Sequence, residues 1–367
     1  MKIHNEIIEK KRRLRVLMSE LKLDAVLIRQ QANFSWLTGG GLNLVGIATE
    51  MGASPLLLTR DKEYVVCNNI EAPRIEKEEK IPEQGYKLLT YKWFEEKERA
   101  LIEKIVGKGR MGSDAPYPEA ENISGHINQL RYSLTSWEVE RYQKLGEMAS
   151  KAVEEAIATI EPGDKECEII GRLCQRLWAD RVDFVTTFCA ADERIANFRH
   201  PIATEKKIEK RAMLGVNARK WGLIVTLTRF VQFGKVPPEL LKQYEDNVYV
   251  ECVFIANTMP GTAVKDILQK GIEAYRERGY PEEYQFHHQG GATGYAGRDY
   301  RVNFNTPDVV EENQAFCWNP SIAGTKSEDT MLATSKGPVL LSNPVHFPVM
   351  EVEAKGQSFK RPAILEK

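Results

Sequence analysis

The chain has 367 residues, of which 42% are hydrophobic and 28% are charged, and its 51 basic and 52 acidic residues give a formal net charge of −1. This ordinary composition predicts a soluble globular protein with two domains, because one hydrophobic core rarely serves so long a chain. The balanced charge gives no electrostatic reason to expect nucleic acid or an anionic membrane as a partner.

The amino-acid sequence shows no pattern typical of a targeting signal. No apolar run approaches the roughly 20 residues that a bilayer span needs, and the charged N-terminal segment lacks the apolar stretch of a signal peptide. The six cysteines are scattered without a CxxC pair, which is typical of reduced, mostly buried thiols. We therefore expect a cytoplasmic protein.

The first part of the chain alternates helical and extended patterns. Hydrophobic periodicity and turn residues predict helices over 1–22, 71–79, 93–106 and 118–130, and strands over 24–29, 33–39, 55–59, 64–67, 86–91 and 109–112. This order predicts a small α/β domain over residues 1–132, followed by a second domain over 133–367.

The second domain opens with a clear helix signal. Thr135 and Glu138 form a capping-box pattern, in which each side chain can bond the other residue's backbone N–H. Apolar residues then recur at three- and four-residue steps from Tyr142 to Ile160. Such a stripe is typical of a helix packed on a core rather than of a cofactor site.

A faint internal repeat follows. The segments 158–164 and 256–262 both contain an apolar stretch, a Pro-Gly turn and then Asp164 or Thr262, residues suited to capping a second helix. The repeat predicts a domain of duplicated halves with a site between them, and chance similarity is the alternative. Residues 248–255 are ambiguous between strand and helix. Strands are expected over 212–219, 222–230, 315–318, 330–333 and 339–341, as an antiparallel sheet covered by helices.

The stretch 286–330 contains most of the reactive-looking side chains. His287 and His288 lead into Gly290-Gly291, and Glu328-Asp329 closes the stretch. Because glycine allows a backbone to approach a ligand closely, this pattern indicates a pocket. A glycine-rich surface loop with incidental histidines is the alternative.

Taken together, these residues resemble the creatinase/aminopeptidase P/methionine aminopeptidase family. The motifs that carry the resemblance are Asn33-Phe-Ser-Trp-Leu-Thr-Gly39, Phe198-Arg-His-Pro201, Ala218-Arg219 with Gly222, Thr228-Arg229, His287-His288-Gln-Gly-Gly291, Asn319-Pro320 and Glu328-Asp329-Thr330. The resemblance implies an α+β protein: an N-terminal α/β creatinase-like domain, followed by a C-terminal pita-bread domain with a curved antiparallel sheet. It also implies a homodimer.

The family's metallopeptidases hold two divalent metals with two Asp, one His and two Glu. By motif match these positions fall on Gly215, Thr226, His288, Asn319 and Glu328, so that only His288 and Glu328 keep the ligand type. Two adjacent dications need several carboxylates to offset their charge, and recruitment of His287 or Asp329 is opposed by the alternation of side chains along a strand. We therefore expect no metal and no other cofactor.

Creatinase, a family member that works without metal, suggests what chemistry remains. By resemblance His200 takes the place of its proton-shuttling histidine, and His288 and Glu328 complete the catalytic set by orienting substrate or stabilising charge. Thr226 and Asn319 would form a neutral hydrogen-bonding wall and His287 would lie beside them. Arg298 and Arg301 are candidates to bind a carboxylate.

Each assignment has a plainer alternative. His200 could be a capped loop residue, His287 a structural histidine, Arg298-Asp299 a surface ion pair, Glu328-Asp329 a strand-end cap, and Cys317 an inert buried thiol. Segment 39–47, where creatinase has a substrate-binding arginine, contains none, so creatine is not the expected substrate.

Three functions stay open. The first, which the retained His200, His288 and Glu328 favour, is metal-independent hydrolysis of a C–N bond in a small amide, an amidino compound or a short peptide. The second is an Xaa-Pro peptidase with a degenerate metal site, and the third is a binding protein without catalysis.

Overall fold

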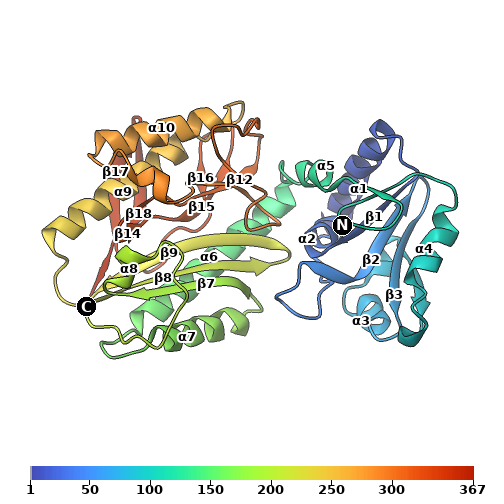
Figure 1. Ribbon diagram of the computed structural model, residues 1–367, viewed down its shortest axis with the longest axis horizontal. Helices are drawn as coiled ribbons and strands as arrows, with labels where there is room; N and C mark the ends of the chain where they lie inside the picture. The colour runs from blue at the N-terminus through green and yellow to red at the C-terminus, as the bar shows by residue number, and fades with distance from the viewer. Residues whose placement is uncertain (1) are drawn as a thin grey trace. The chain divides into compact units, whose positions relative to one another are not determined.

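The computed structural model describes residues 2–367, and the chain folds into two compact units, Met1–Arg131 and Tyr132–Lys367 (Figure 1). Each unit has its own sheet system and its own core. Among the described residues, no helix is both long and apolar enough to cross a membrane.

The first unit is a six-stranded mixed sheet with the order β4-β3-β2-β1-β5-β6. Its strands are β1 (Ala25–Gln30), β2 (Met51–Thr59), β3 (Glu63–Asn68), β4 (Lys87–Tyr91), β5 (Met111–Ser113) and β6 (Ala120–Asn122). Its helices are α1 (Lys2–Glu20), α2 (Gln31–Leu37), α3 (Ala72–Lys77), α4 (Glu98–Val106) and α5 (Ser124–Gln129), with 3₁₀ turns η1 (Ile81–Gln84) and η2 (Trp93–Glu95).

Three predictions for this unit were wrong. Residues 33–39 were expected as a strand but belong mainly to helix α2, whose residues are buried except Ala32. A short helix buried on nearly all sides shows no amphipathic stripe, so periodicity does not reveal it. The helix expected over 93–106 is broken at Glu96, which has a φ of 47°, and the helix expected over 118–130 is β6 followed by α5.

The second unit contains two larger sheets between helical layers, together with two two-stranded sheets. Its helices are α6 (Ser136–Ala158), α7 (Glu166–Ala179), α8 (Arg194–Asn197), α9 (Pro238–Asn257) and α10 (Val264–Glu277), with the 3₁₀ turn η3 (Glu283–Phe286). Its strands are β7 (Asp183–Ala191), β8 (Arg211–Lys220), β9 (Leu223–Gln232), β10 (Gly290–Thr293), β11 (Tyr300–Arg301), β12 (Gln314–Trp318), β13 (Ser321–Ile322), β14 (Thr325–Lys326), β15 (Asp329–Ala333), β16 (Val339–Leu340), β17 (Val349–Ala354), β18 (Gln357–Pro362) and β19 (Leu365–Glu366).

The two larger sheets of this unit have the orders β19-β9-β8-β7 and β11-β10-β12-β15-β16, and β13-β14 and β17-β18 are two-stranded. All pairs are antiparallel except β19 with β9. Helices α6 and α7 pack on the first sheet, and α9 and α10 lie over the second (Figure 1). Segment 248–255, ambiguous in sequence, lies within helix α9. The sheets join where Thr330 Oγ1 accepts from Thr226 N at 2.8 Å and donates to Thr226 O at 3.0 Å, while Thr228 N donates to Glu328 O.

The predicted repeat corresponds to matching hydrogen bonds. Gly163 N donates to Ile208 O, and Ile208 N donates to the carbonyl of Asp164; Gly261 N and Val310 N make the corresponding bonds in the other half. Both glycines have positive φ, 95° and 89°, which glycine adopts without strain. Asp164 does not cap α7 as predicted, because its carboxylate accepts from Glu161 N and pairs with Arg172.

The capping box predicted at the start of the unit is present. Thr135 N donates to Glu138 Oε2 at 2.8 Å, and Glu138 N donates to Thr135 Oγ1 at 3.3 Å. The bonds satisfy backbone groups that helix α6 would leave without a partner, so they fix where this helix begins.

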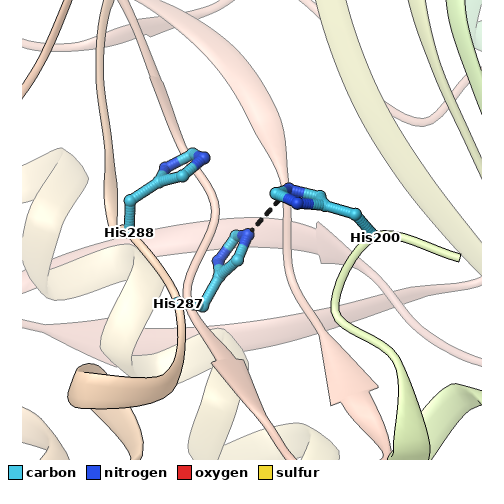
Figure 2. A group of neighbouring side chains, drawn as sticks. All are labelled: His200, His287 and His288. Carbon is cyan, nitrogen blue, oxygen red and sulfur yellow. Dashed lines mark hydrogen bonds between the residues drawn. The ribbon is translucent and has the colours of Figure 1, made fainter.

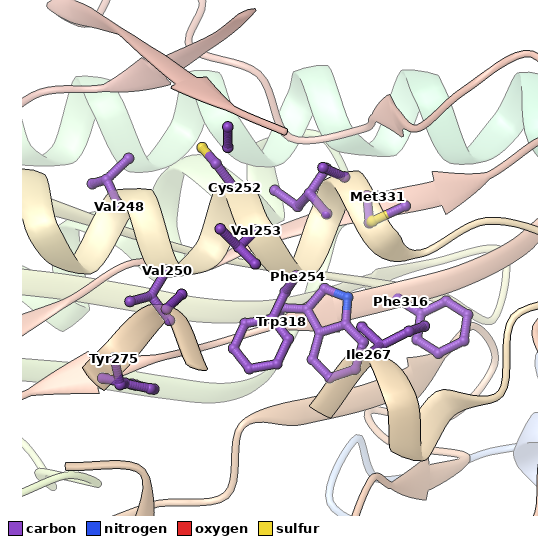
Figure 3. Packing of buried hydrophobic residues seen from close by; sticks show 14 of the residues in the cluster. Val248, Val250, Cys252, Val253, Phe254, Ile267, Tyr275, Phe316, Trp318 and Met331 are labelled. Atoms are coloured by element: carbon purple, nitrogen blue, oxygen red, sulfur yellow. The ribbon is translucent and has the colours of Figure 1, made fainter. Parts of the chain in front are cut away.

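The core beneath the second sheet fixes the orientation of β12. Phe316 and Trp318 face α9 and α10, where the Trp318 ring stacks on Phe254 with centroids 4.6 Å apart (Figure 3). Trp318 Nε1 also donates to Thr258 Oγ1 at 2.9 Å. Because side chains alternate along a strand, Cys317 points to the opposite face, where the candidate site lies.

Candidate functional site

Three predicted histidines converge from two segments. His200 lies in the loop after α8, whereas His287 and His288 lie between η3 and β10 (Figure 2). His287 Nε2 is 3.0 Å from His200 Nε2, and the His287 and His288 rings stack with centroids 4.4 Å apart. The expectation that neighbouring residues point to opposite faces was wrong for this pair, because they precede the strand rather than belong to it.

The pKa of all three imidazoles is lowered, although His287 and His288 are more buried than His200. His287, only 8% exposed, has a pKa lowered to about 2 by burial and by the Lys326 charge. Burial, and to a smaller extent the charge of Arg298, lower the pKa of His288 to about 4. Burial and the charge of Lys326 also lower the pKa of His200. Neutral imidazoles can accept a proton or bind a metal near neutral pH.

Glu328 is the second centre of the site. Thr228 Oγ1 donates to Glu328 Oε2 at 2.7 Å, and Lys326 Nζ lies 3.3 Å from the same oxygen. On the other side Arg298 Nη2 lies 3.7 Å from Glu328 Oε1. Burial by itself would raise the pKa of Glu328, but the two cations and the Thr228 hydroxyl hold that pKa below its ordinary value. The carboxylate is therefore ionised and faces two positive charges.

A chain of ring contacts joins the two centres. Lys326 Nζ lies over the Phe188 ring, 5.4 Å from its centroid, and Phe188 stacks on His200 with centroids 5.7 Å apart. Phe188 comes from β7, so the first sheet supplies the wall between Glu328 and the histidines.

Arg298 does not form the surface ion pair that was the plainer alternative for it. Its side chain is 13% exposed, and besides Glu328 it contacts Cys317 Sγ through Nη2 at 3.3 Å. Burial raises the pKa of Cys317 to about 12, which suits the inert thiol expected for it. Arg301 lies on β11 and is exposed, although its charge contributes to lowering the pKa of His200 and His288.

The predicted neutral wall carries polar atoms without partners. Thr226 and Asn319 are 1% and 2% exposed, and neither Thr226 Oγ1 nor Asn319 Oδ1 has a hydrogen-bond partner. The same holds for Nδ1 of His287 and of His288, and for Nε of Arg298. Unsatisfied buried polar atoms are costly and need an explanation. Five of them on the predicted site residues indicate a surface built to receive a polar ligand.

Asp329 points away from the site into a buried ion network. Arg361 Nη2 donates to Asp329 Oδ2 at 2.7 Å and to Glu251 Oε2 at 2.6 Å. Arg229 Nη1 donates to Asp329 Oδ1 at 3.0 Å, and Asp329 N donates to Glu251 Oε1 at 2.9 Å. All four side chains are fully buried. This network fixes the start of β15 and thereby the position of Glu328.

The sequence analysis missed Lys326, Thr228 and Phe188 as site residues. Lys326 is 5% exposed and comes two positions before Glu328, so an extended segment places both side chains on one face. That spacing was the available signal. Thr228 was quoted only as part of a motif, although it pairs with Gly215 across β8 and β9.

The donor set does not fit the two metal ions that the resemblance implies. Gly215 has no side chain, and a Cβ built there would lie 2.8 Å from Thr228 Oγ1. Thr226 and Asn319 offer neutral oxygens, and Glu328 is already matched by Lys326 and Arg298. Two dications need several free carboxylates. The one group among the described residues with ligating geometry is the histidine cluster, whose ligand atoms lie within 4.8 Å of one another.

Comparison with known proteins agrees with the resemblance. Residues 10–141 match the Creatinase/Prolidase N-terminal domain, and residues 140–335, more than half of the chain, match metallopeptidase family M24. The chain belongs to metallopeptidase family M24. The expected pita-bread architecture with a creatinase-type N-terminal domain is thereby confirmed.

The relatives of this M24 chain are distant but cover most of it. The Xaa-Pro dipeptidase of Pyrococcus horikoshii is 24% identical over 90% of this chain and 95% of its own length. An Xaa-Pro dipeptidase structure from Bacillus anthracis superposes with a TM-score of 0.77 at 19% identity, over 98% of this chain and 100% of that one. The N-terminal domain of the FACT complex subunit SPT16 from Cicer arietinum reaches 0.72 at 11% identity, over 93% and 97%. At such identities structural likeness shows the fold alone.

Proposed function

We propose that this chain hydrolyses the peptide bond of short peptides. Its relatives named Xaa-Pro dipeptidase carry this substrate class in their name. The observation that carries the proposal is the approach of the His200–His287 pair to the buried Glu328 group through Phe188. A proton-accepting group and a charged binding group thus flank one surface with unsatisfied polar atoms.

His200 is the group we assign to proton transfer. Its pKa is lowered by burial and by Lys326, so the ring is neutral near pH 7, and its exposure leaves it open to water. His200 takes a proton from water while the water oxygen bonds to the carbonyl carbon. When the C–N bond breaks, His200 returns that proton to the leaving nitrogen. His287, in hydrogen-bonding distance, orients the His200 ring.

The remaining predicted residues would bind and position the peptide. His288 stacks on His287 and keeps that ring in place. Thr226 and Asn319 offer hydrogen bonds to the peptide through their unpartnered oxygens, and the exposed Arg301 would meet a charged end of the substrate. We expect these residues to affect substrate binding more than proton transfer.

The reaction proposed here uses no metal ion, because the donor set does not fit a dinuclear centre. The test is hydrolysis of Xaa-Pro and other dipeptides by protein purified with a chelator, followed by chromatography of the released amino acids. We expect turnover that His200→Gln reduces by 10²-fold or more, while His126→Gln, an exposed histidine of the first unit, leaves it unchanged.

Two outcomes would contradict this proposal. Turnover that appears only after zinc or manganese is added would mean that the histidine cluster binds a metal needed for catalysis. Binding of dipeptides without any turnover, with or without metal, would indicate a binding protein. The homodimer implied by the resemblance stays a prediction, which sedimentation measurements would test.

A further inference from the structure

The charges of the site do not balance. Lys326 and Arg298 bring two positive charges to Glu328, which supplies one negative charge. Lys326 is 5% exposed and the Arg298 side chain 13%, so solvent screens neither charge well. A buried cation without a full counter-charge is costly. Among these three side chains the surplus is one positive charge.

The unsatisfied groups of the site include hydrogen-bond donors. Arg298 Nε carries a hydrogen and has no partner, while Arg298 Nη1 donates to Gly297 O at 2.6 Å. Thr226 Oγ1 is also without a partner and can donate. Lys326 Nζ has three hydrogens, and its contacts are Glu328 and the Phe188 ring. A ligand that accepts several hydrogen bonds would satisfy them.

A metal ion at the histidines would add positive charge to this surplus. The ligand atoms of His200, His287 and His288 are close enough for one ion, but Lys326 acts electrostatically on all three rings, and Arg298 and Arg301 act on those of His200 and His288. Like charges at such range repel, and Glu328, whose charge acts on His200, is already shared by two cations. An anion is favoured by the same charges that disfavour a cation.

We infer that Lys326 and Arg298 form an anion-binding site that replaces the electrostatic role of the family's metal ions, and that it binds a negatively charged oxygen of a small carboxylate ligand. Where the proposed hydrolase function holds, this oxygen belongs to the substrate, and the site favours acidic peptides or those with a free carboxylate. The inference deepens that proposal, but it concerns binding and does not need turnover.

The test uses inorganic phosphate as a probe, titrated calorimetrically into the full chain in chelator at constant ionic strength. We expect one phosphate per chain, a Kd at least tenfold weaker in Lys326→Gln, and a Kd within about threefold of wild type in Lys326→Arg, which keeps the charge. Lys270→Gln removes a half-exposed lysine paired with Glu273 and should leave phosphate binding unchanged.

Several results would overturn the inference: no stoichiometric phosphate binding by the folded wild type, equal affinity in Lys326→Gln, or binding that appears only after zinc is added. If Lys326→Gln does not fold, Arg298→Gln is the second variant. A dipeptide and its C-terminal amide form a further pair of probes, and the free acid should bind at least tenfold more tightly. Phosphate binding without dipeptide hydrolysis would leave this inference intact and contradict only the proposed function.

Discussion

The ammonium group of Lys326 lies 3.3 Å from the carboxylate of Glu328, and both side chains are almost completely buried. In the family's metallopeptidases the resemblance places a metal ion beside this glutamate; here the counter-charge belongs to the chain itself. Glu328 therefore has a structural role in addition to any role in chemistry.

Removing the carboxylate should destabilise the second unit. Glu328→Gln keeps the side-chain shape but leaves Lys326 and Arg298 facing each other without a counter-charge. We expect a loss of about 3 kcal/mol in the free energy of unfolding, measured with urea, because breaking one partner of a buried pair is costly. Glu273→Gln, in the exposed pair with Lys270, should leave the free energy of unfolding essentially unchanged. Equal effects of the two substitutions would contradict this account.

Substitution in the buried ion network around Arg361 should lower the free energy of unfolding more than Glu328→Gln does. Arg361→Met removes the guanidinium that both Glu251 and Asp329 contact, so two carboxylates are left buried and close together. We expect a loss of at least about 4 kcal/mol in the free energy of unfolding. Arg12→Met, which removes an exposed guanidinium paired with Glu9, is the control and should leave the free energy of unfolding nearly unchanged. A small effect of Arg361→Met would show that the network contributes little.

Two helical glycines should respond in opposite directions to the same change. A Cβ on Gly146 in α6 would lie 1.9 Å from the backbone oxygen of Leu341, whereas a Cβ on Gly171 in α7 meets nothing within 4 Å. Gly146→Ala should therefore destabilise by at least about 2 kcal/mol, because backbone must move. Gly171→Ala should stabilise by about 0.5–1 kcal/mol through helix propensity. Thermal and urea unfolding measure both effects. Stabilisation by Gly146→Ala would contradict the close packing of the Leu341 backbone against Gly146.

Acid should weaken the fold through the histidine cluster. The pKa of His287 is lowered from 6.5 to about 2, so below pH 6.5 the unfolded chain binds a proton that the folded chain does not. Stability from this group is complete above pH 6.5 and falls as the pH drops, by up to about 1.4 kcal/mol per pH unit. Urea unfolding across this range should show a shallower slope for His287→Asn than for wild type. Exposed His126→Asn is the control, and equal slopes for wild type and His287→Asn would refute the assignment.

Periodic and motif-based features were predictable from sequence. The capping box at Thr135 and Glu138 starts a helix where expected, because both bonds are local. The histidines and Glu328 were identified by motif spacing. The structure brings the three imidazoles together, and Phe188 contacts both His200 and Lys326, the partner of Glu328. Lys326 was not predicted although it lies two positions before Glu328, because its burial also depends on Phe188 of β7, a tertiary contact that no local pattern reveals. The helical state of 33–39 likewise depends on tertiary contacts, since Asn33 Nδ2 donates to Asp114 at 2.9 Å.

Arg361 contacts residues that lie far earlier in the chain, and this separation affects how the protein folds during synthesis. During synthesis Glu251 and Asp329 leave the ribosome before the guanidinium that contacts both of them. At translation rates of roughly 5–20 residues per second, the nascent second unit waits for seconds with these carboxylates uncompensated. In the first unit the wait is shorter, because Arg131 follows Asp114 closely and the hydrogen-bonded set of Asn33, Asp114 and Arg131 is complete by residue 131. The first unit should therefore acquire protease resistance on stalled nascent chains well before the second.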